Sequence, residues 1–126
     1  MSNYSIFTFD PYNTGALLHV TLDGDAKLAQ PNVEGLYILT SIPVNGKQNW
    51  IHVQGSIAIW YDKEHKHWKI GPKDSLGTCS TCYLHSTENT KTPKEATTWQ
   101  YWSGNHVKWM ATSKICSMDL GFFKDF

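Results

Sequence analysis

Residues 50–70 read WIHVQGSIAIWYDKEHKHWKI, and this stretch decides the fold. Two short apolar runs flank the pair Gln54-Gly55, where glycine supplies the backbone freedom that a tight hairpin turn needs. A polar run then separates the second apolar run from Trp68 and Ile70. This alternation of strand-length runs and turn residues predicts two consecutive β-hairpins, which end at the chain breaker Gly71-Pro72.

The sequence on either side of this stretch shows the same alternation of strand-length runs and turn residues. Asn45-Gly46 is the favoured dipeptide of a type I′ hairpin turn, because both residues tolerate positive φ. Together with a strand expected at 35–40, this turn predicts an antiparallel meander over residues 35–70. Further strands are predicted at 5–9, 16–22, 81–85, 98–102 and 106–112, and the tail 115–126 is predicted to form a strand or a short helix.

These elements define the expected fold class. It is all-β and mainly antiparallel, a compact β-sandwich or β-barrel of roughly eight to ten short strands. No window shows 3.6-residue periodicity over more than about three turns, so we expect little helix. A chain of 126 residues has the usual size of one domain, and residues 1–126 are therefore expected to form a single β domain.

The charge composition argues against nucleic-acid recognition. Eleven lysines balance eleven acidic residues, and arginine is absent. The chain therefore has no net charge to attract a polyanion, and no guanidinium group for bidentate contacts with phosphate or guanine. No run approaches the roughly 18 apolar residues of a membrane span. We expect neither nucleic acid nor a membrane span.

The cysteines and the N-terminal residues bear on the cellular compartment. Three cysteines are an odd number, which does not complete a disulfide framework. Residues 1–10 lack the basic region and apolar run of a signal peptide. A reducing, cytoplasmic location is the simplest expectation, and an extracellular one is expected if the chain is a fragment of a larger secreted protein.

The segment Cys79-Ser80-Thr81-Cys82-Tyr83-Leu84-His85 holds two thiols and an imidazole. Cys116 would complete a tetrahedral zinc site, but it lacks the neighbouring ligand of a usual paired knuckle. If 81–85 is a strand, Cys82 and His85 fall on opposite faces. A disulfide between two of the cysteines is a further alternative, and buried or idle thiols are the state that we favour.

His65 and His67, with Asp62 and Glu64 nearby, could hold a metal ion, since residues i and i+2 of a strand share a face. A run of charged and imidazole side chains between two aromatic strands is also typical of a solvated hairpin tip. We favour the solvated tip. Titration of the imidazoles would then give at most some pH sensitivity.

The sequence contains no recognisable catalytic or cofactor motif. We find no Ser-His-Asp or Cys-His arrangement, no glycine-rich phosphate loop and no pair of acids at characteristic spacing. His19, His52 and His106 fall in predicted strands, where a hydrogen-bonded structural imidazole is the ordinary role. We therefore expect no cofactor, and binding rather than catalysis.

Six tryptophans are the most informative feature of the composition. Trp60 and Tyr61 are neighbours in a predicted strand, as are Tyr101 and Trp102, so one ring of each pair is expected on the outer face. An exposed ring beside polar side chains forms an apolar platform with a polar rim, which suits sugars and partner side chains. Alternatively, these rings cover the ends of a barrel or the second layer of a sandwich.

From about residue 33 to residue 109 the order of several short motifs is familiar. They are Gly35-Leu36-Tyr37, Val44-Asn45-Gly46-Lys47 with Trp50, Ala58-Ile59-Trp60-Tyr61, Trp68-Lys69-Ile70-Gly71-Pro72, Leu76-Gly77, Pro93 and Trp99. In this order the chain resembles small glycine- and tryptophan-punctuated β modules of large multidomain proteins of invertebrates and protists. Those modules more often carry Asn-Gly-Arg and a tyrosine where this chain has Lys47 and Trp50. The resemblance implies adhesion or recognition and specifies no functional residue.

The sequence thus predicts a non-catalytic binding module with lectin-like recognition of carbohydrate or another uncharged polar ligand through exposed aromatic residues. The expected ligand contacts are Tyr61, Asp62, Trp68, Tyr101, Trp102, Asn105, Lys108 and Trp109. One alternative is a protein-interaction or self-assembly domain, in which outer rings form an apolar patch that binds a protein partner or a second copy. Another is a zinc-stabilised domain or metal-dependent enzyme that uses Cys79, Cys82, His85 and Cys116.

Overall fold

The computed structural model describes residues 15–104, 108–112 and 116–118. These residues form nine strands, one short α-helix and three 3-10 helices. The strands are β1 Leu17–Thr21, β2 Gly35–Leu39, β3 Trp50–His52, β4 Ile57–Asp62, β5 His67–Pro72, β6 Leu84–Ser86, β7 Trp99–Ser103, β8 Lys108–Thr112 and β9 Cys116–Met118. The helical segments are α1 Gly24–Ala29, η1 Pro31–Val33, η2 Lys73–Ser75 and η3 Pro93–Glu95. The predicted all-β class with little helix is confirmed.

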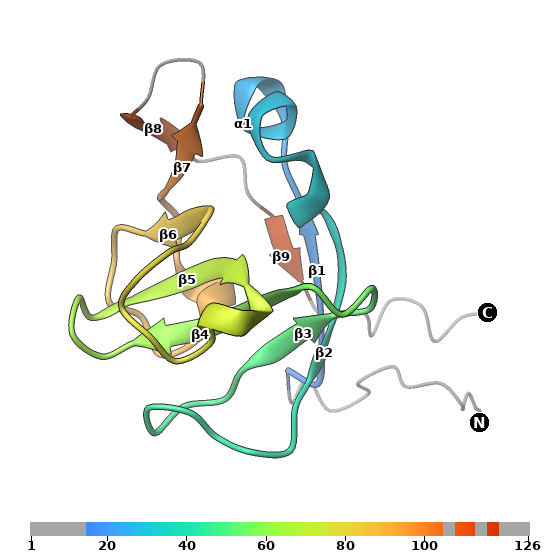
Figure 1. Cartoon of the computed structure of the whole chain (residues 1–126), viewed down its shortest axis with the longest axis vertical. Helices are drawn as coiled ribbons and strands as arrows, with labels where there is room; N and C mark the ends of the chain where they lie inside the picture. Colours follow the sequence, from blue (N-terminus) through green and yellow to red (C-terminus); the bar gives the residue numbers. More distant parts are fainter. Residues whose placement is uncertain (1–14, 105–107, 113–115, 119–126) are drawn as a thin grey trace.

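All nine strands belong to one antiparallel sheet. Its order is β8-β7-β6-β5-β4-β3-β2-β1-β9, so β1 to β8 form an up-and-down meander and β9 returns to lie beside β1. The sheet curls into a half-barrel (Figure 1). Because of this curl, α1, which follows β1, contacts β7 near the opposite end of the strand order.

The two hairpins predicted for residues 50–70 are confirmed. β3 pairs with β4, and Gly55 in their turn has a φ of +86°, a left-handed conformation that suits glycine. β4 and β5 pair along their whole length, and Asp62 and His67 lie opposite each other at the end of this hairpin. The sequence therefore places Asp62 and His67 side by side through the pairing of two strands.

The predicted Asn45-Gly46 turn is also confirmed. Both residues have positive φ, and Val44 and Lys47 exchange backbone hydrogen bonds of 2.9 and 3.1 Å on either side of the turn. The Asn45 amide donates to the backbone oxygens of Tyr61 and Gly77, at 2.7 and 3.1 Å. The turn is thereby tied to the end of β4 and to the segment that follows β5.

The remaining predictions for secondary structure have different outcomes. Strands lie within or close to the predicted ranges 16–22, 35–40, 81–85, 98–102 and 106–112, as β1, β2, β6, β7 and β8. β9 begins the predicted tail, whereas the strand predicted at 5–9 lies outside the described residues. The helix α1 was not predicted, because its six residues are too few to show helical periodicity.

The inner face of the sheet carries the hydrophobic core, in which aromatic rings pack edge to face. Trp68 lies between Trp50 and Tyr61, with ring centroids 6.0 and 5.3 Å away. Four tryptophans are almost completely buried: Trp50, Trp60, Trp68 and Trp99.

The outer face of β4 and β5 is covered by the segment 73–82. Trp60 points outward, yet its ring is buried and its Nε1 donates to the Thr78 carbonyl at 3.0 Å. Gly71 allows the close approach of this segment, since a Cβ atom at Gly71 would lie 2.8 Å from the Cys82 Cα. One ring of the Trp60-Tyr61 pair lies on the outer face, as predicted, but neither ring is exposed, because each face of the sheet is covered at this point.

Candidate functional site

Four of the eight predicted contact residues are buried, so the expectation that they are exposed is wrong: Tyr61, Asp62, Trp68 and Tyr101. The segment that follows β6 covers two of the rings. The Tyr61 hydroxyl donates to Asn89 Oδ1 at 2.8 Å, and Trp68 Nε1 donates to the Thr90 carbonyl at 3.0 Å. These contacts explain why both rings are buried. The alternation of side chains along one strand does not reveal that a loop covers them.

The other predicted contacts belong to the β7–β8 hairpin. Trp102 and Trp109 are cross-strand partners, and their rings meet edge to face with centroids 5.5 Å apart. Trp109 is 36% exposed and Lys108 is exposed, whereas Trp102 is half-buried. The prediction that one ring of the Tyr101-Trp102 pair lies on the outer face is confirmed, since Tyr101 belongs to the core whereas Trp102 packs on Trp109. Asn105 lies outside the described residues.

Trp109 lies at one end of a row of three imidazoles on the outer face of the sheet. Its ring meets that of His85 edge to face at 4.6 Å. His85 stacks on His67 at 4.6 Å, and His67 stacks on His65 at 5.4 Å. We call His65, His67, His85, Trp109 and Trp102 the aromatic row. It runs from β8 across the sheet to the β4–β5 turn.

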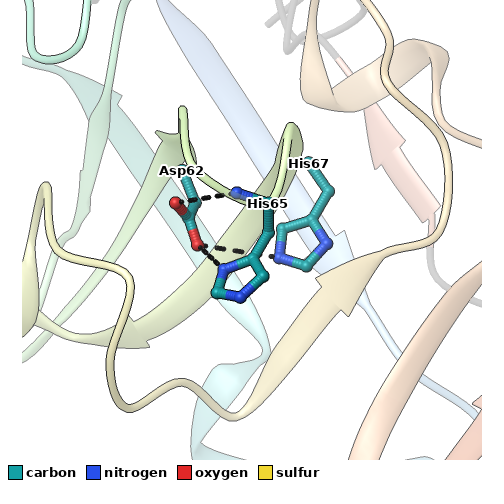
Figure 2. Close-up of side chains that lie close together, drawn as sticks. All are labelled: Asp62, His65 and His67. Atoms are coloured by element: carbon teal, nitrogen blue, oxygen red, sulfur yellow. Dashed lines mark hydrogen bonds and ion pairs between the residues drawn. The ribbon is translucent and has the colours of Figure 1, made fainter.

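Asp62 lies at the β4–β5 end of the aromatic row, and its carboxylate is buried. Oδ2 accepts from His65 Nδ1 at 2.6 Å, and Oδ1 accepts from the His65 backbone N–H at 3.3 Å (Figure 2). Oδ1 also accepts from the Glu64 backbone N–H at 2.9 Å. Burial raises the pKa of this carboxyl, but hydrogen bonds from His65, Lys69 and the backbone outweigh burial and lower the pKa to about 2. Asp62 is therefore an anion at neutral pH.

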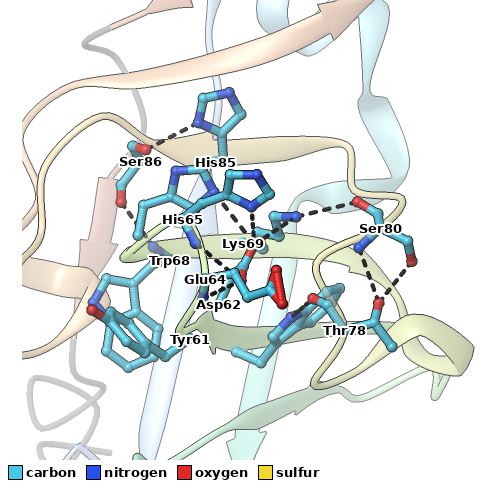
Figure 3. Close-up of polar contacts among 12 residues, drawn as sticks. Tyr61, Asp62, Glu64, His65, Trp68, Lys69, Thr78, Ser80, His85 and Ser86 are labelled. Atoms are coloured by element: carbon cyan, nitrogen blue, oxygen red, sulfur yellow. Dashed lines mark hydrogen bonds and ion pairs between the residues drawn. The ribbon is translucent and has the colours of Figure 1, made fainter. Parts of the chain in front are cut away.

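Lys69 is the buried cation that balances Asp62. Its Nζ lies 2.9 Å from Asp62 Oδ2 and donates to the Ser80 carbonyl at 3.2 Å (Figure 3). The Ser80 hydroxyl in turn shares a 2.7 Å hydrogen bond with the Thr78 hydroxyl. The ion pair thus connects the β4–β5 hairpin to the segment 73–82, and each buried charge has a partner.

His67 completes the group, and its Nε2 atom is buried without a hydrogen-bond partner among the described residues. Asp62 Oδ2 lies 3.9 Å from this atom, which is too far for a hydrogen bond. Burial, followed by the charges of His85 and Lys69, lowers the pKa of His67 to about 4. The predicted solvated hairpin tip is therefore confirmed for the exposed residues 63–66 and is wrong for Asp62.

Asp62, His65 and His67 are also the group of potential metal ligands that the described residues bring together. One ligand atom from each lies within 4.8 Å of the other two. A carboxylate oxygen with two imidazole nitrogens is a donor set that zinc accepts. The spacing of these three residues was visible in the sequence, whereas the burial of Asp62 was not.

The cysteine cluster does not form such a group in the described residues. Cys79 and Cys82 are free thiols, so the alternative of a disulfide between these two is wrong. Burial raises the pKa of Cys82 to about 11 and keeps its thiol protonated at neutral pH. His85 belongs to the aromatic row. Cys116 lies on β9, whose neighbour is β1, at the opposite end of the strand order from β8.

A second candidate site is a hollow of about 420 Å³ at the other end of the β4–β5 hairpin. It lies where β3 ends, β4 begins and β6 begins, with α1 and η1 alongside. We call it the polar hollow, and its lining residues are Ala29, Gln30, Pro31, Asn32, Val33, His52, Gln54, Ser56, Ile57 and Tyr83. The volume lies in the range of small-ligand sites, about 300–1,000 Å³.

No lining residue of the polar hollow is an acid or a lysine. Both ring nitrogens of His52 are hydrogen-bonded, because Nδ1 accepts from the Gln54 backbone N–H at 3.1 Å and Nε2 then donates to the Glu34 carbonyl at 2.8 Å. Gln30 Nε2 donates to the Trp102 carbonyl at 2.8 Å, which fixes one amide of the rim. The hollow therefore offers hydrogen-bonding groups without a formal charge.

The sequence analysis did not identify the residues of the polar hollow. Gln54-Gly55 was predicted to form a turn and does so, whereas no element was predicted for residues 29–33. The segments that line the hollow meet because the sheet curls, and no motif within any one of these segments indicates that curl.

The chain was compared with protein-family models, with curated proteins and with solved structures, and none of these comparisons yielded a match. The resemblance to small β modules therefore stays a prediction. No helix in the described part of the chain has the length and apolar character needed to cross a membrane.

Proposed function

We propose that this chain is a non-catalytic, lectin-like binding domain that takes an uncharged polar ligand, of the class of a carbohydrate, in the polar hollow. The observation that carries the proposal is the lining of the hollow, which combines amide and hydroxyl groups with a tyrosine and holds no formal charge. A charged ligand would lose its hydration there without gaining an ion pair. An uncharged polyhydroxylated ligand exchanges water hydrogen bonds for protein hydrogen bonds.

The arrangement of the rim supports this proposal. Asn32 and Gln54 are exposed, on η1 and in the β3–β4 turn, and both line the hollow. Their amides each provide a donor and an acceptor, which suits the adjacent hydroxyls of a sugar. Tyr83 is half-buried directly before β6 and offers an apolar ring beside these amides. The proposal thus keeps the ligand class expected from the sequence and places it among different residues.

Binding to a panel of neutral glycans, measured by isothermal titration calorimetry, tests the proposal. We expect saturable binding of one glycan class, weakened about three- to tenfold by Asn32→Ala and by Gln54→Ala, since each removes a hydrogen-bonding group. Gln48→Ala is the matched control, because Gln48 is an exposed amide outside the polar hollow. Binding that all three variants weaken equally would overturn the proposal.

Failure to bind any neutral glycan would also count against the proposal. In that case a concentration-dependent dimer in sedimentation velocity would favour the self-assembly alternative. Ile38 on β2 and Val53, directly after β3, are 45% and 51% exposed, and exposed apolar side chains are what such an alternative requires.

A further inference from the structure

Asp62, His65 and His67 lie apart from the polar hollow, at the opposite end of the β4–β5 hairpin. Figure 2 shows the carboxylate and the two imidazoles converging beside the turn. The two distances from Asp62 Oδ2 are 2.6 Å to His65 Nδ1 and 3.9 Å to His67 Nε2. These ligand types, one oxygen and two imidazole nitrogens, are those that zinc and related first-row transition metals bind.

A second observation points to a ligand at this group. His67 Nε2 is a buried polar atom with no hydrogen-bond partner among the described residues, and its nearest anionic neighbour is Asp62 Oδ2. Buried polar atoms without a partner are rare in proteins, and each requires an explanation. A cation between the imidazole and the carboxylate would give this nitrogen its partner.

We propose that Asp62, His65 and His67 form a three-ligand site for a divalent transition-metal ion, with zinc as the expected occupant. The metal takes the place of the proton that His65 Nδ1 shares with Asp62 Oδ2, and this proton moves to the exposed His65 Nε2 or to water. Zinc–ligand bonds of about 2.0–2.2 Å in tetrahedral geometry set neighbouring ligand atoms roughly 3.3 Å apart. The observed 2.6 and 3.9 Å lie on either side of this separation.

Small side-chain rotations would equalise the two separations. The His65 side chain is 56% exposed and lies in the turn, so its ring is free to move away from Asp62. The Asp62 carboxylate is held from behind by the backbone N–H groups of Glu64 and His65 and by Lys69. The site therefore has one adjustable ligand on a prearranged carboxylate, and a fourth position is left for water.

Lys69 sets the limit on affinity. Its ammonium lies 2.9 Å from the carboxylate oxygen that would bind the metal, so the two cations repel each other. Replacing Lys69 with methionine removes this repulsion and is expected to tighten metal binding. If the group is an ordinary ion-pair network with no metal site, this variant should bind metal no more tightly than the wild-type protein.

The test is titration of the full-length, chelator-treated protein with Zn²⁺ by competition, and with Co²⁺ by visible absorption. We expect one equivalent to bind, with the intense d–d bands of tetrahedral cobalt. His65→Gln and His67→Gln should each weaken binding by more than the roughly 10- to 100-fold that is typical of losing an outer-shell partner. His19→Gln, which removes an imidazole from β1, should leave it unchanged.

Circular dichroism of each variant checks that it folds, and His65→Gln is the decisive variant because His65 is exposed. No stoichiometric binding by the wild-type protein would overturn the proposal. Binding that survives in His65→Gln, or that falls equally in His19→Gln, would overturn it as well. None of these outcomes bears on glycan binding in the polar hollow.

Discussion

His67 makes the stability of the metal-free protein depend on pH. Its pKa is lowered from 6.5 to about 4 by burial and by neighbouring charges, so the folded protein binds this proton less readily than the unfolded chain. Above about pH 6.5 His67 is neutral in both the folded and the unfolded chain, so it does not lower the free energy of unfolding. Between pH 6.5 and pH 4 the unfolded chain takes up the proton first, and the free energy of unfolding falls. This loss amounts to about 3 kcal/mol in the free energy of unfolding.

Urea unfolding at pH 4.5 and pH 7, with a chelator present, measures this dependence. We expect His67→Gln to lose less stability than the wild-type protein on going to pH 4.5, because glutamine takes up no proton. His19→Gln serves as the control and should keep the wild-type dependence. The same pH dependence in His67→Gln as in the wild-type protein would contradict this assignment.

Single residues also show how far the sequence could be interpreted. A metal site at His65 and His67, with Asp62 and Glu64 nearby, was the less favoured interpretation of this run, and the structure brings Asp62, His65 and His67 together. The burial of Asp62 could not be predicted from neighbouring residues. It depends on the ion pair with Lys69 and on the segment 73–82, whose Ser80 carbonyl accepts a hydrogen bond from Lys69. The same segment buries Trp60, whose exposure depends on a cover that strand alternation does not reveal.

At the scale of elements, the contact between β5 and the segment 73–82 depends on Gly71. A Cβ atom there would lie 2.8 Å from the Cys82 Cα and 3.1 Å from the Thr81 carbonyl oxygen, so the backbone would have to move. We expect Gly71→Ala to lower the free energy of unfolding by about 1–3 kcal/mol, as overpacking does. Thermal or urea unfolding would measure the change.

Gly104→Ala is the matched control, because a Cβ atom at Gly104 meets nothing within 4 Å. We expect little change in its stability. Equal stability of Gly71→Ala and Gly104→Ala would show that the segment 73–82 does not pack on β5 as described.

The hairpins were the most predictable elements, since Asn45-Gly46 and Gln54-Gly55 carry their turn chemistry locally. The pairing of β5 with β6 was not predicted in detail. Eleven residues, 73–83, lie between the end of β5 and the start of β6, and they show no period-two pattern. The helix α1 is stabilised by contact with β7, which is distant in sequence, so its residues alone do not predict it.

For the whole molecule, the curl of the sheet determines which tryptophans reach solvent. Trp50, Trp60, Trp68 and Trp99 are buried, whereas Trp109 is 36% exposed and Trp102 is half-buried. We expect acrylamide to quench a minor part of the fluorescence, and Trp109→Phe to remove most of that part. Trp68→Phe should leave the quenchable part unchanged, and a larger loss in Trp68→Phe than in Trp109→Phe would contradict the described fold.

The same curl explains why the polar hollow could not be predicted from the sequence. Its lining comes from residues 29–33, 52–57 and Tyr83, which meet only when β3, β4 and β6 are bent around one another. The sequence could predict the all-β class, whereas the uncharged ligand class stays a prediction. It could not predict which polar turn residues converge.

Two-dimensional NMR of the side-chain amides, during titration with a neutral glycan that binds, tests whether the polar hollow holds the ligand. We expect the largest chemical-shift changes on Gln30, Asn32 and Gln54, while the resonances of the Gln48 and Gln100 amides stay in place. Changes centred on Trp109 and Gln100 would instead place the ligand on the aromatic row and contradict the claim that the polar hollow is the binding site.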